Sequence, residues 1–116
     1  MTQQTTAMAS RTDADWLGLA GARVLVAGAG GIGGACAAAY AAAGASVVVA
    51  DRDESALERA VQADPAIQTV AADLTAHGAG EAVVAQTVER LGGIDVLLHA
   101  VGINDRRPIL EFAEDE

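Results

Sequence analysis

The sequence has few aromatic residues, few basic residues and one cysteine, and each shortage narrows the possibilities. Aromatic residues make up only 3% of the chain, whereas 13 residues are glycine. The core must therefore use small side chains, which let helices and strands approach closely. The lone Cys36 cannot form an internal disulfide, which favours a reducing, cytoplasmic setting. Seven basic against 16 acidic residues give a formal net charge of −9. That charge repels phosphate backbones and anionic lipid, so we expect neither nucleic acid nor membrane as a partner.

Long apolar runs are also missing. Glycine or charge interrupts every run well short of the roughly 20 residues of a membrane span, and the polar residues 1–10 do not resemble a secretory signal. Hydrophobic residues still make up 52% of the 116 residues, enough for the core of one domain. We predict a disordered tail over residues 1–15 and a single domain over residues 16–116, anchored at its start by Trp16 and Leu17.

Short apolar runs alternate with helical patterns along the chain. We predict strands over residues 23–27, 46–50, 67–72 and 94–100, and helices over residues 35–43, from residue 55 to a point before Pro65, and over residues 81–91. Ser55 and Glu58 fit a capping box for the second helix, and Pro65 ends it. Helical spacing gives the second helix the apolar positions Leu57, Ala60 and Val61, and the third Val83, Val84, Thr87, Val88 and Leu91. This order predicts an α/β fold with a parallel sheet and helices on both faces.

The first strand runs directly into a glycine-rich turn that opens a helix. Gly28, Gly30 and Gly33 form G-x-G-x-x-G, and Gly31 and Ile32 lie between the last two glycines. The first glycine permits the tight turn, the second lets a pyrophosphate approach the backbone, and the third lets the helix pack on the strand. The helix N-terminus adds free N–H groups and partial positive charge. The alternative is a glycine-rich turn in a core of small residues.

The second strand ends at an acidic residue, Asp51, roughly 20 residues beyond the glycines. A carboxylate there accepts hydrogen bonds from adenosine ribose hydroxyls and repels the extra phosphate of NADP. The neighbouring Arg52 weakens this discrimination, because a guanidinium can receive that phosphate. We expect NAD as the cofactor, with NADP less favoured; the alternative is that Asp51 is an ordinary solvated loop residue.

Three further segments resemble the short-chain dehydrogenase/reductase family from about Leu17 onward. Asp73-Leu74-Thr75 resembles the family's aspartate after the third strand, which contacts adenine, and residues 92–98 resemble the lead-in to its fourth strand. Residues 99–102, His-Ala-Val-Gly, stand where the family has Asn-Asn-Ala-Gly against the cofactor. The resemblance implies a Rossmann-like, doubly wound sheet with strand order 3-2-1-4. The expected cofactor-binding residues are Gly28, Gly30, Gly31, Ile32, Gly33, Asp51, Arg52, Asp73, Leu74, Ala100 and Gly102.

The sequence departs from the family at two motifs. Ala27 stands where the family's glycine turn usually has threonine, and the turn is one residue shorter. His99 and Ala100 replace the two asparagines. His99 either braces the sheet through its ring N–H or is a half-buried histidine that hydrogen-bonds a backbone carbonyl.

The family's catalytic serine and Tyr-x-x-x-Lys pair have no counterpart in these 116 residues. The only tyrosine, Tyr40, falls in the first helix, and Gly44 stands four residues later where lysine would be needed. We expect no catalytic residue and no metal site, and Cys36 is better explained as a small core residue than as a nucleophile. The resemblance implies NAD(P)-dependent oxidation of a small alcohol or reduction of a carbonyl. The chain would be the cofactor-binding half of such an enzyme, truncated after about four strands and inactive alone.

Two other hypotheses remain open. A non-catalytic dinucleotide-binding or sensor module would also lack catalytic residues. A methyltransferase would also begin with a glycine-rich turn, although the Asp-Leu-Thr and Gly-Gly-Ile-Asp segments argue against it. The fourth strand would leave one edge unpaired, so we expect homo-oligomers or self-association through that sheet edge.

Overall fold

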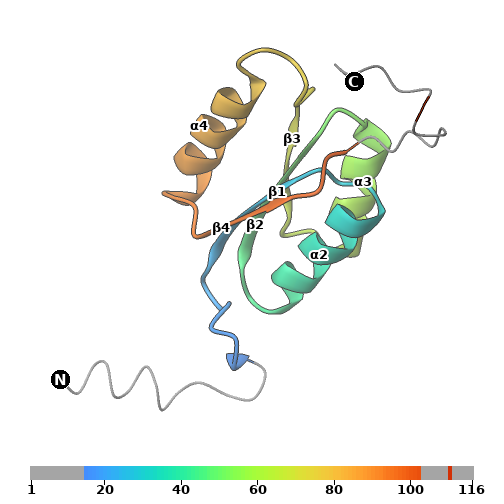
Figure 1. The fold of residues 1–116 in the computed structure, drawn as a ribbon. Coiled ribbons are helices and arrows are strands. Elements are labelled where there is room, and N and C mark those ends of the chain that lie inside the picture. The colour runs from blue at the N-terminus through green and yellow to red at the C-terminus, as the bar shows by residue number, and fades with distance from the viewer. Residues whose placement is uncertain (1–14, 103–109, 111–116) are drawn as a thin grey trace.

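The fold is a four-stranded parallel sheet with helices on both faces, as predicted (Figure 1). The computed structural model describes residues 15–102 and residue 110. The sheet has the order β3-β2-β1-β4. Its strands are β1 (Arg23–Ala27), β2 (Ser46–Asp51), β3 (Gln68–Ala71) and β4 (Val96–His99), and its helices are α2 (Gly31–Ala42), α3 (Glu54–Ala63) and α4 (Ala79–Leu91). The expected tail, apart from Asp15, and the acidic C-terminal residues lie outside the described residues.

The two central strands, β1 and β2, divide the core into two layers. Successive side chains of a strand point to opposite faces. Val24, Val26, Val47 and Val49 therefore pack beneath α2 and α3, whereas Leu25, Val48 and Ala50 pack with Val70 and Val83 beneath α4. Figure 1 shows the two helices on one side of the sheet and α4 on the other. Continuous apolar runs form strands here because both of their faces are covered.

All three helices begin earlier than their sequence patterns indicate, α4 at Ala79 instead of residue 81. α2 begins at Gly31, so the glycine turn itself forms its first turn. The capping box at Ser55 is wrong, because Asp53 is the N-cap of α3 and its side chain accepts a hydrogen bond from the Ser55 backbone N–H. An aspartate two residues ahead of the serine competes for the same role and starts the helix sooner.

Several apolar positions expected in the core are exposed. The exposed fractions are 37% for Val61, 42% for Val84 and 43% for Val88, and Trp16 and Leu17 are more exposed still. The sheet covers only the middle of the apolar face that each helix presents, and the apolar residues beside it stay exposed. On α4 this part is Val83 and Thr87, whose hydroxyl donates to the Val83 carbonyl 2.8 Å away.

An ion pair joins the amino ends of β1 and β4. The Arg23 guanidinium donates to both carboxylate oxygens of Asp95, at 2.9 and 3.0 Å, and the Arg23 backbone N–H donates to the same carboxylate at 2.8 Å. The pKa of Asp95 is lowered to about 2, chiefly by the hydrogen bond from the Arg23 side chain and then by the one from its backbone. The pair fixes β4 against β1 at the end of the sheet where these strands begin.

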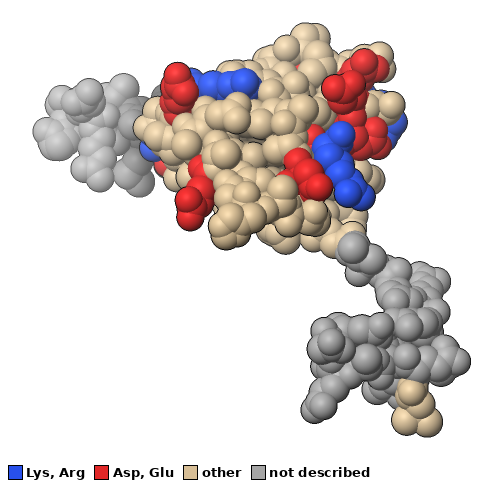
Figure 2. Space-filling view, turned by 90° about the horizontal axis from the view of Figure 1, so that it is seen from above, with Lys and Arg blue, Asp and Glu red and all other residues tan. Residues whose placement is uncertain are grey.

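The charged side chains are dispersed over the surface. On the face that Figure 2 shows, uncharged atoms cover most of the area, and acidic side chains stand at separate places, some of them beside an arginine. None of the described helices is long and apolar enough to cross a membrane. Within residues 15–102, no three histidine, cysteine or acidic side chains are grouped in a way that could hold a metal ion.

Candidate functional site

A cavity of about 550 Å³ lies at the carboxyl ends of the strands. Such a position is where open α/β sheets bind their ligands. Eight of the eleven predicted site residues line it: Gly28, Gly30, Asp51, Arg52, Asp73, Leu74, Ala100 and Gly102. The fold thus brings together residues from four separate segments that follow the four strands.

The glycine turn forms one wall of the cavity, and its three glycines have different surroundings. Gly28 has a φ of +107°, and a Cβ there would lie 2.9 Å from the Ala100 carbonyl carbon and oxygen. A Cβ on Gly33 would overlap the carbonyl oxygen of Gly28. A Cβ on Gly30 would meet nothing within 4 Å. Packing therefore requires glycine at the first and third positions, whereas the second faces open space beside the cavity.

The start of α2 leaves its backbone N–H groups without a side-chain partner. Its N-cap is Gly30, which has no side chain to accept a hydrogen bond, and its first turn contains no acidic residue. The first N–H groups of a helix have no intrahelical acceptor and carry a partial positive charge. This end of the helix is suited to an anionic group in the cavity.

Asp51 lies at the end of β2 and is held against the glycine turn. One carboxylate oxygen accepts from the Ala29 N–H at 2.7 Å, and the other accepts from the Asp53 N–H at 2.9 Å. Burial alone would raise the pKa of Asp51, but hydrogen bonds from the N–H groups of Asp53, Ala29 and Arg52, together with the Arg52 charge, lower it below its ordinary value. The carboxylate stays ionised and fixed in direction. Each of its oxygens can accept a further bond.

Asp73 lies on the other side of the cavity, after β3. One of its oxygens accepts from the Thr75 hydroxyl at 2.6 Å and from the Thr75 N–H at 3.0 Å. These hydrogen bonds lower the pKa of Asp73, and the charge of Arg52 lowers it further. The loop is folded so that the second carboxylate oxygen makes no hydrogen bond with the described residues. The residues between 15 and 102 that line the cavity therefore supply two ionised carboxylates and one guanidinium.

The structure does not bring every predicted residue to the cavity. Ile32 is 77% exposed, and Gly33 is buried behind the turn. Gly31 lines a smaller hollow between α2 and α3. Sequence reasoning missed three lining residues, Ala72, Thr75 and Val101. Thr75 could have been found from its spacing, because Asp-x-Thr favours the hydrogen-bonded turn that this loop adopts.

Comparison with known proteins identifies the family. The family model described as "short chain dehydrogenase" matches residues 22–116. The chain belongs to this family. It is 38% identical over 100 residues to L-xylulose reductase of Mesocricetus auratus, which covers 85% of this chain and 39% of that protein. It is 36% identical over 99 residues to sorbitol dehydrogenase of Cereibacter sphaeroides, which covers 84% of this chain and 39% of that protein.

Solved structures of the family agree with the fold. A short chain dehydrogenase from Mycobacterium smegmatis superposes with a TM-score of 0.74 at 32% identity, covering 84% of this chain and 43% of the other. A 3-ketoacyl-(acyl-carrier-protein) reductase from Brucella melitensis, solved in complex with NADH, superposes with a TM-score of 0.63 at 36% identity, covering 68% of this chain and 33% of the other. The chain thus spans well under half the length of these short-chain dehydrogenases.

Tyr40 and His99, two chemically active side chains, do not line the cavity. Tyr40 is half-buried in α2 against the core. His99, at the end of β4, is exposed and makes no side-chain hydrogen bond with the described residues, so neither expected hydrogen bond forms there. The 116 residues contain no lysine at all. No tyrosine–lysine pair can therefore form within this chain.

Proposed function

We propose that the cavity at the strand ends binds NAD, as the cofactor-binding part of a short-chain dehydrogenase that oxidises an alcohol or reduces a carbonyl. The observation that carries the proposal is the Asp51 carboxylate, held by the Ala29 N–H at 2.7 Å beside the uncapped start of α2. This arrangement offers a fixed hydrogen-bond acceptor and an anion-binding helix end within one cavity. A dinucleotide needs both, for its ribose hydroxyls and for its pyrophosphate.

The residues present fit a dinucleotide in three respects. The open space beside Gly30 leaves room for a pyrophosphate to approach the backbone. The ionised Asp51 has lone pairs remaining for ribose hydroxyls. The free carboxylate oxygen of Asp73 suits an amino donor such as that of adenine. The cofactor, when bound, supplies the hydride chemistry, and these residues bind and orient it.

The balance of charges favours NAD over NADP. The extra phosphate of NADP would come close to Asp51, whose pKa is already lowered, and Asp73 adds a second negative charge to the cavity. Among the described residues, Arg52 is the one cation that lines the cavity. The related reductase from Brucella melitensis was solved in complex with NADH, a dinucleotide without that extra phosphate.

A binding titration of NAD against NADP on the full chain tests this proposal. We expect tighter binding of NAD, and Asp51→Ser should reduce that preference by more than tenfold, because a hydrogen bond to a charged group contributes about 1.5–3 kcal/mol. Arg52→Gln is the matched variant, since it should weaken the binding of NADP more than the binding of NAD. Equal affinities in the unaltered chain would contradict the assignment of Asp51. Because Asp51 also holds the glycine turn, circular dichroism must verify that each variant is folded.

Catalysis needs groups that these 116 residues do not contain. We propose that the chain binds the dinucleotide without oxidising alcohols, since losing general acid–base catalysis alone lowers a rate by roughly 10²–10⁴-fold. NADH formation with a panel of sugar alcohols and diols measures this. Turnover above the rate without protein would point to Tyr40 or His99, and substitution of each would identify the residue.

We further propose that copies of the chain associate through β4. This strand is at the edge of the sheet, and Leu97 on it is 60% exposed. An apolar edge strand with unpaired backbone groups favours pairing with another chain. Sedimentation of the unaltered chain should reveal oligomers that Leu97→Lys reduces, whereas a monomer at all concentrations would refute this.

A further inference from the structure

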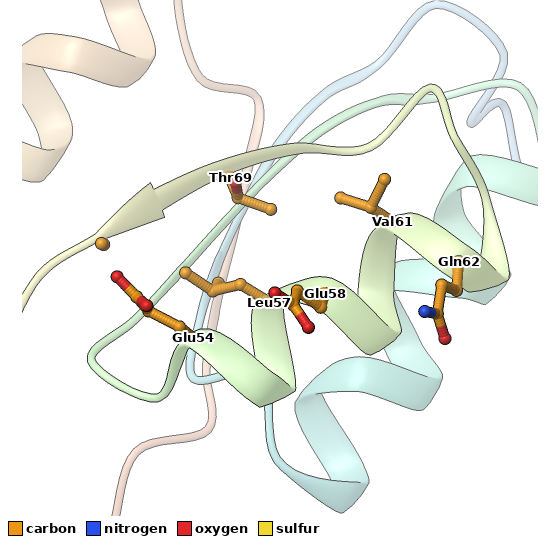
Figure 3. Close-up of a pocket in the computed structure, with 7 residues that line it drawn as sticks. Glu54, Leu57, Glu58, Val61, Gln62 and Thr69 are labelled. Atoms are coloured by element: carbon orange, nitrogen blue, oxygen red, sulfur yellow. The ribbon is translucent and has the colours of Figure 1, made fainter.

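A second hollow lies between α3 and β3 and shares no lining residue with the cavity at the strand ends (Figure 3). This α3–β3 groove has a volume of about 490 Å³. Figure 3 shows Leu57, Val61 and Thr69 between the helix and the strand, with Glu54 and Glu58 projecting from the same helix. Ala71 and Gln62 complete the lining. The floor is therefore mainly apolar, and the two charged residues that line the groove, Glu54 and Glu58, are both negative.

The two glutamates of the groove form no ion pair with any residue that the structure describes. They stand four residues apart on α3, where like charges repel one another slightly. The only ion pair among residues 15–102 is Arg23–Asp95, at the amino ends of β1 and β4. Glu54 and Glu58 are both exposed. Their charges are thus available to a cationic group that enters the groove.

The strand beside the groove is the outer edge of the sheet. β3 pairs only with β2, and the Ala72 N–H donates to the Asp51 carbonyl, so the backbone groups of Ala71 face away from the sheet. Arg90 of α4 already donates to the Thr69 carbonyl at 2.9 Å. Val61, 37% exposed, stands opposite the strand. An extended segment along β3 would meet an apolar contact, the free backbone groups of Ala71 and two carboxylates, whereas the Thr69 carbonyl is already occupied by Arg90.

We propose that the α3–β3 groove docks an extended peptide segment of a partner protein, in which an apolar side chain is flanked by arginine or lysine. The apolar side chain packs on Val61 and Leu57, and the cations pair with Glu54 and Glu58. A second copy of this chain is a less favourable occupant than a basic partner, because its net charge of −9 opposes pairing with the two glutamates, whereas the proposed association through β4 relies on edge-strand pairing and Leu97. Nucleotides and nucleic acid carry the same sign of charge and are disfavoured for the same reason.

Fluorescence anisotropy with a labelled peptide Arg-Val-Arg-Val-Arg tests the proposal on the full chain. We expect saturable binding at low salt, and none with the matched peptide Glu-Val-Glu-Val-Glu. The double variant Glu54→Gln/Glu58→Gln should weaken binding about fivefold, the scale of two exposed ion pairs. The matched control Glu81→Gln/Glu89→Gln removes two acids from α4 and should change binding less than twofold. Equal weakening by both double variants would mean that the peptide responds only to the overall acidity of the chain, which overturns the proposal.

A second measurement locates the bound peptide. Titration of the isotope-labelled chain by NMR should shift the amide signals of Val61, Thr69 and Ala71 before those of Gly28 or Gly30. Val61→Ser should weaken binding at both low and high salt, because an apolar contact is not screened as ion pairs are. Shifts confined to the cavity at the strand ends would overturn the proposal. Glutamate-dependent dimers in the chain without peptide would also overturn it, since a second copy would then occupy the groove.

Discussion

Helices α2 and α3 pack beside each other on one face of the sheet, yet their N-termini are built in opposite ways. The N-terminus of α3 is capped by a side chain of the protein itself: Asp53 accepts a hydrogen bond from the Ser55 N–H at 3.0 Å, and Glu54 adds a negative charge in the first turn. α2 begins at Gly30 with neither a capping side chain nor an acid. A good cap typically stabilises a helix by about 1 kcal/mol. With glycine as its N-cap, α2 gives up only a few tenths of a kcal/mol of that contribution, at the helix start that adjoins the glycine turn.

The difference separates a structural helix start from one that is open to a ligand. The Asp53 carboxylate at the start of α3 satisfies the Ser55 N–H and would repel phosphate. The same groups at the start of α2 stay free for an anion. The contrast supports the proposed dinucleotide site more directly than the glycine spacing does, because glycines can be present for packing alone.

The largest effect should come from the glycine that packing requires. Gly33→Ala places a Cβ against the Gly28 backbone, 2.8 Å from its carbonyl carbon, so the turn or the helix must shift. We expect the free energy of unfolding to fall by about 2–3 kcal/mol, measured by urea denaturation. Gly31→Ala is the matched control, because a Cβ there meets nothing within 4 Å and alanine favours a helix. A control that destabilised as much would show that the whole turn, rather than this contact, is sensitive.

The second-largest effect should come from a substitution that makes the start of α2 resemble that of α3. Gly30→Asp adds both a capping carboxylate and a negative charge, in a place with open space. We expect the free energy of unfolding to rise by about 0.5–1 kcal/mol, while NAD affinity falls by more than tenfold. Denaturation and an NAD titration on the same sample measure both. Retained affinity would mean that the phosphates bind elsewhere in the chain.

Removal of the cap from α3 is the reverse test. Asp53→Ala deletes the acceptor for the Ser55 N–H, and we expect a loss of about 1 kcal/mol in the free energy of unfolding. NAD affinity should change little, because Asp53 does not line the cavity and Asp51 is bonded to its backbone N–H, which alanine keeps. A large loss of NAD binding would show that the start of α3 belongs to the site.

The sequence predicted the fold well because the signals for it are local. Continuous apolar runs such as residues 23–27 and 46–50 form strands only when both faces are covered, and glycine or proline marks where most elements end. The order of the strands follows from the right-handed crossover between successive parallel strands together with the family resemblance. Exact helix starts were less predictable, since Asp53 and Ser55 are both good caps and only the hydrogen bond made in the fold decides between them.

The candidate site was predicted in part, because spacing along the chain does not give direction in space. The same spacing that marks Gly28 and Gly30 as lining residues also includes Ile32 and Gly33, which do not line the cavity. Ile32 is exposed to solvent, and Gly33 is buried behind the turn. The bond from Ala29 to Asp51 joins residues 22 apart, and no local pattern encodes it. The exposure of Val84 and Val88 depends on how wide a sheet lies beneath α4, which helical periodicity does not reveal.

The smallest effect should come from the opposite end of the sheet, which neither helix start touches. The Arg23 side chain, and then its backbone N–H, lower the pKa of Asp95 to about 2 from 3.8. Since the folded pKa lies below the unfolded value, the stabilisation by this carboxylate is fully present above about pH 3.8 and is lost as the pH falls towards 2. Asp95→Asn should therefore lower stability slightly at neutral pH, and its difference from the unaltered chain should disappear between pH 4 and 2.

The effect is small because both partners of the ion pair are more than a third exposed, at 41% and 43%. Urea denaturation at steps of half a pH unit measures it, with NAD affinity at pH 7 expected to stay unchanged. A difference that persisted undiminished at pH 2 would mean that Asp95 stabilises β4 through hydrogen bonds that do not depend on its charge.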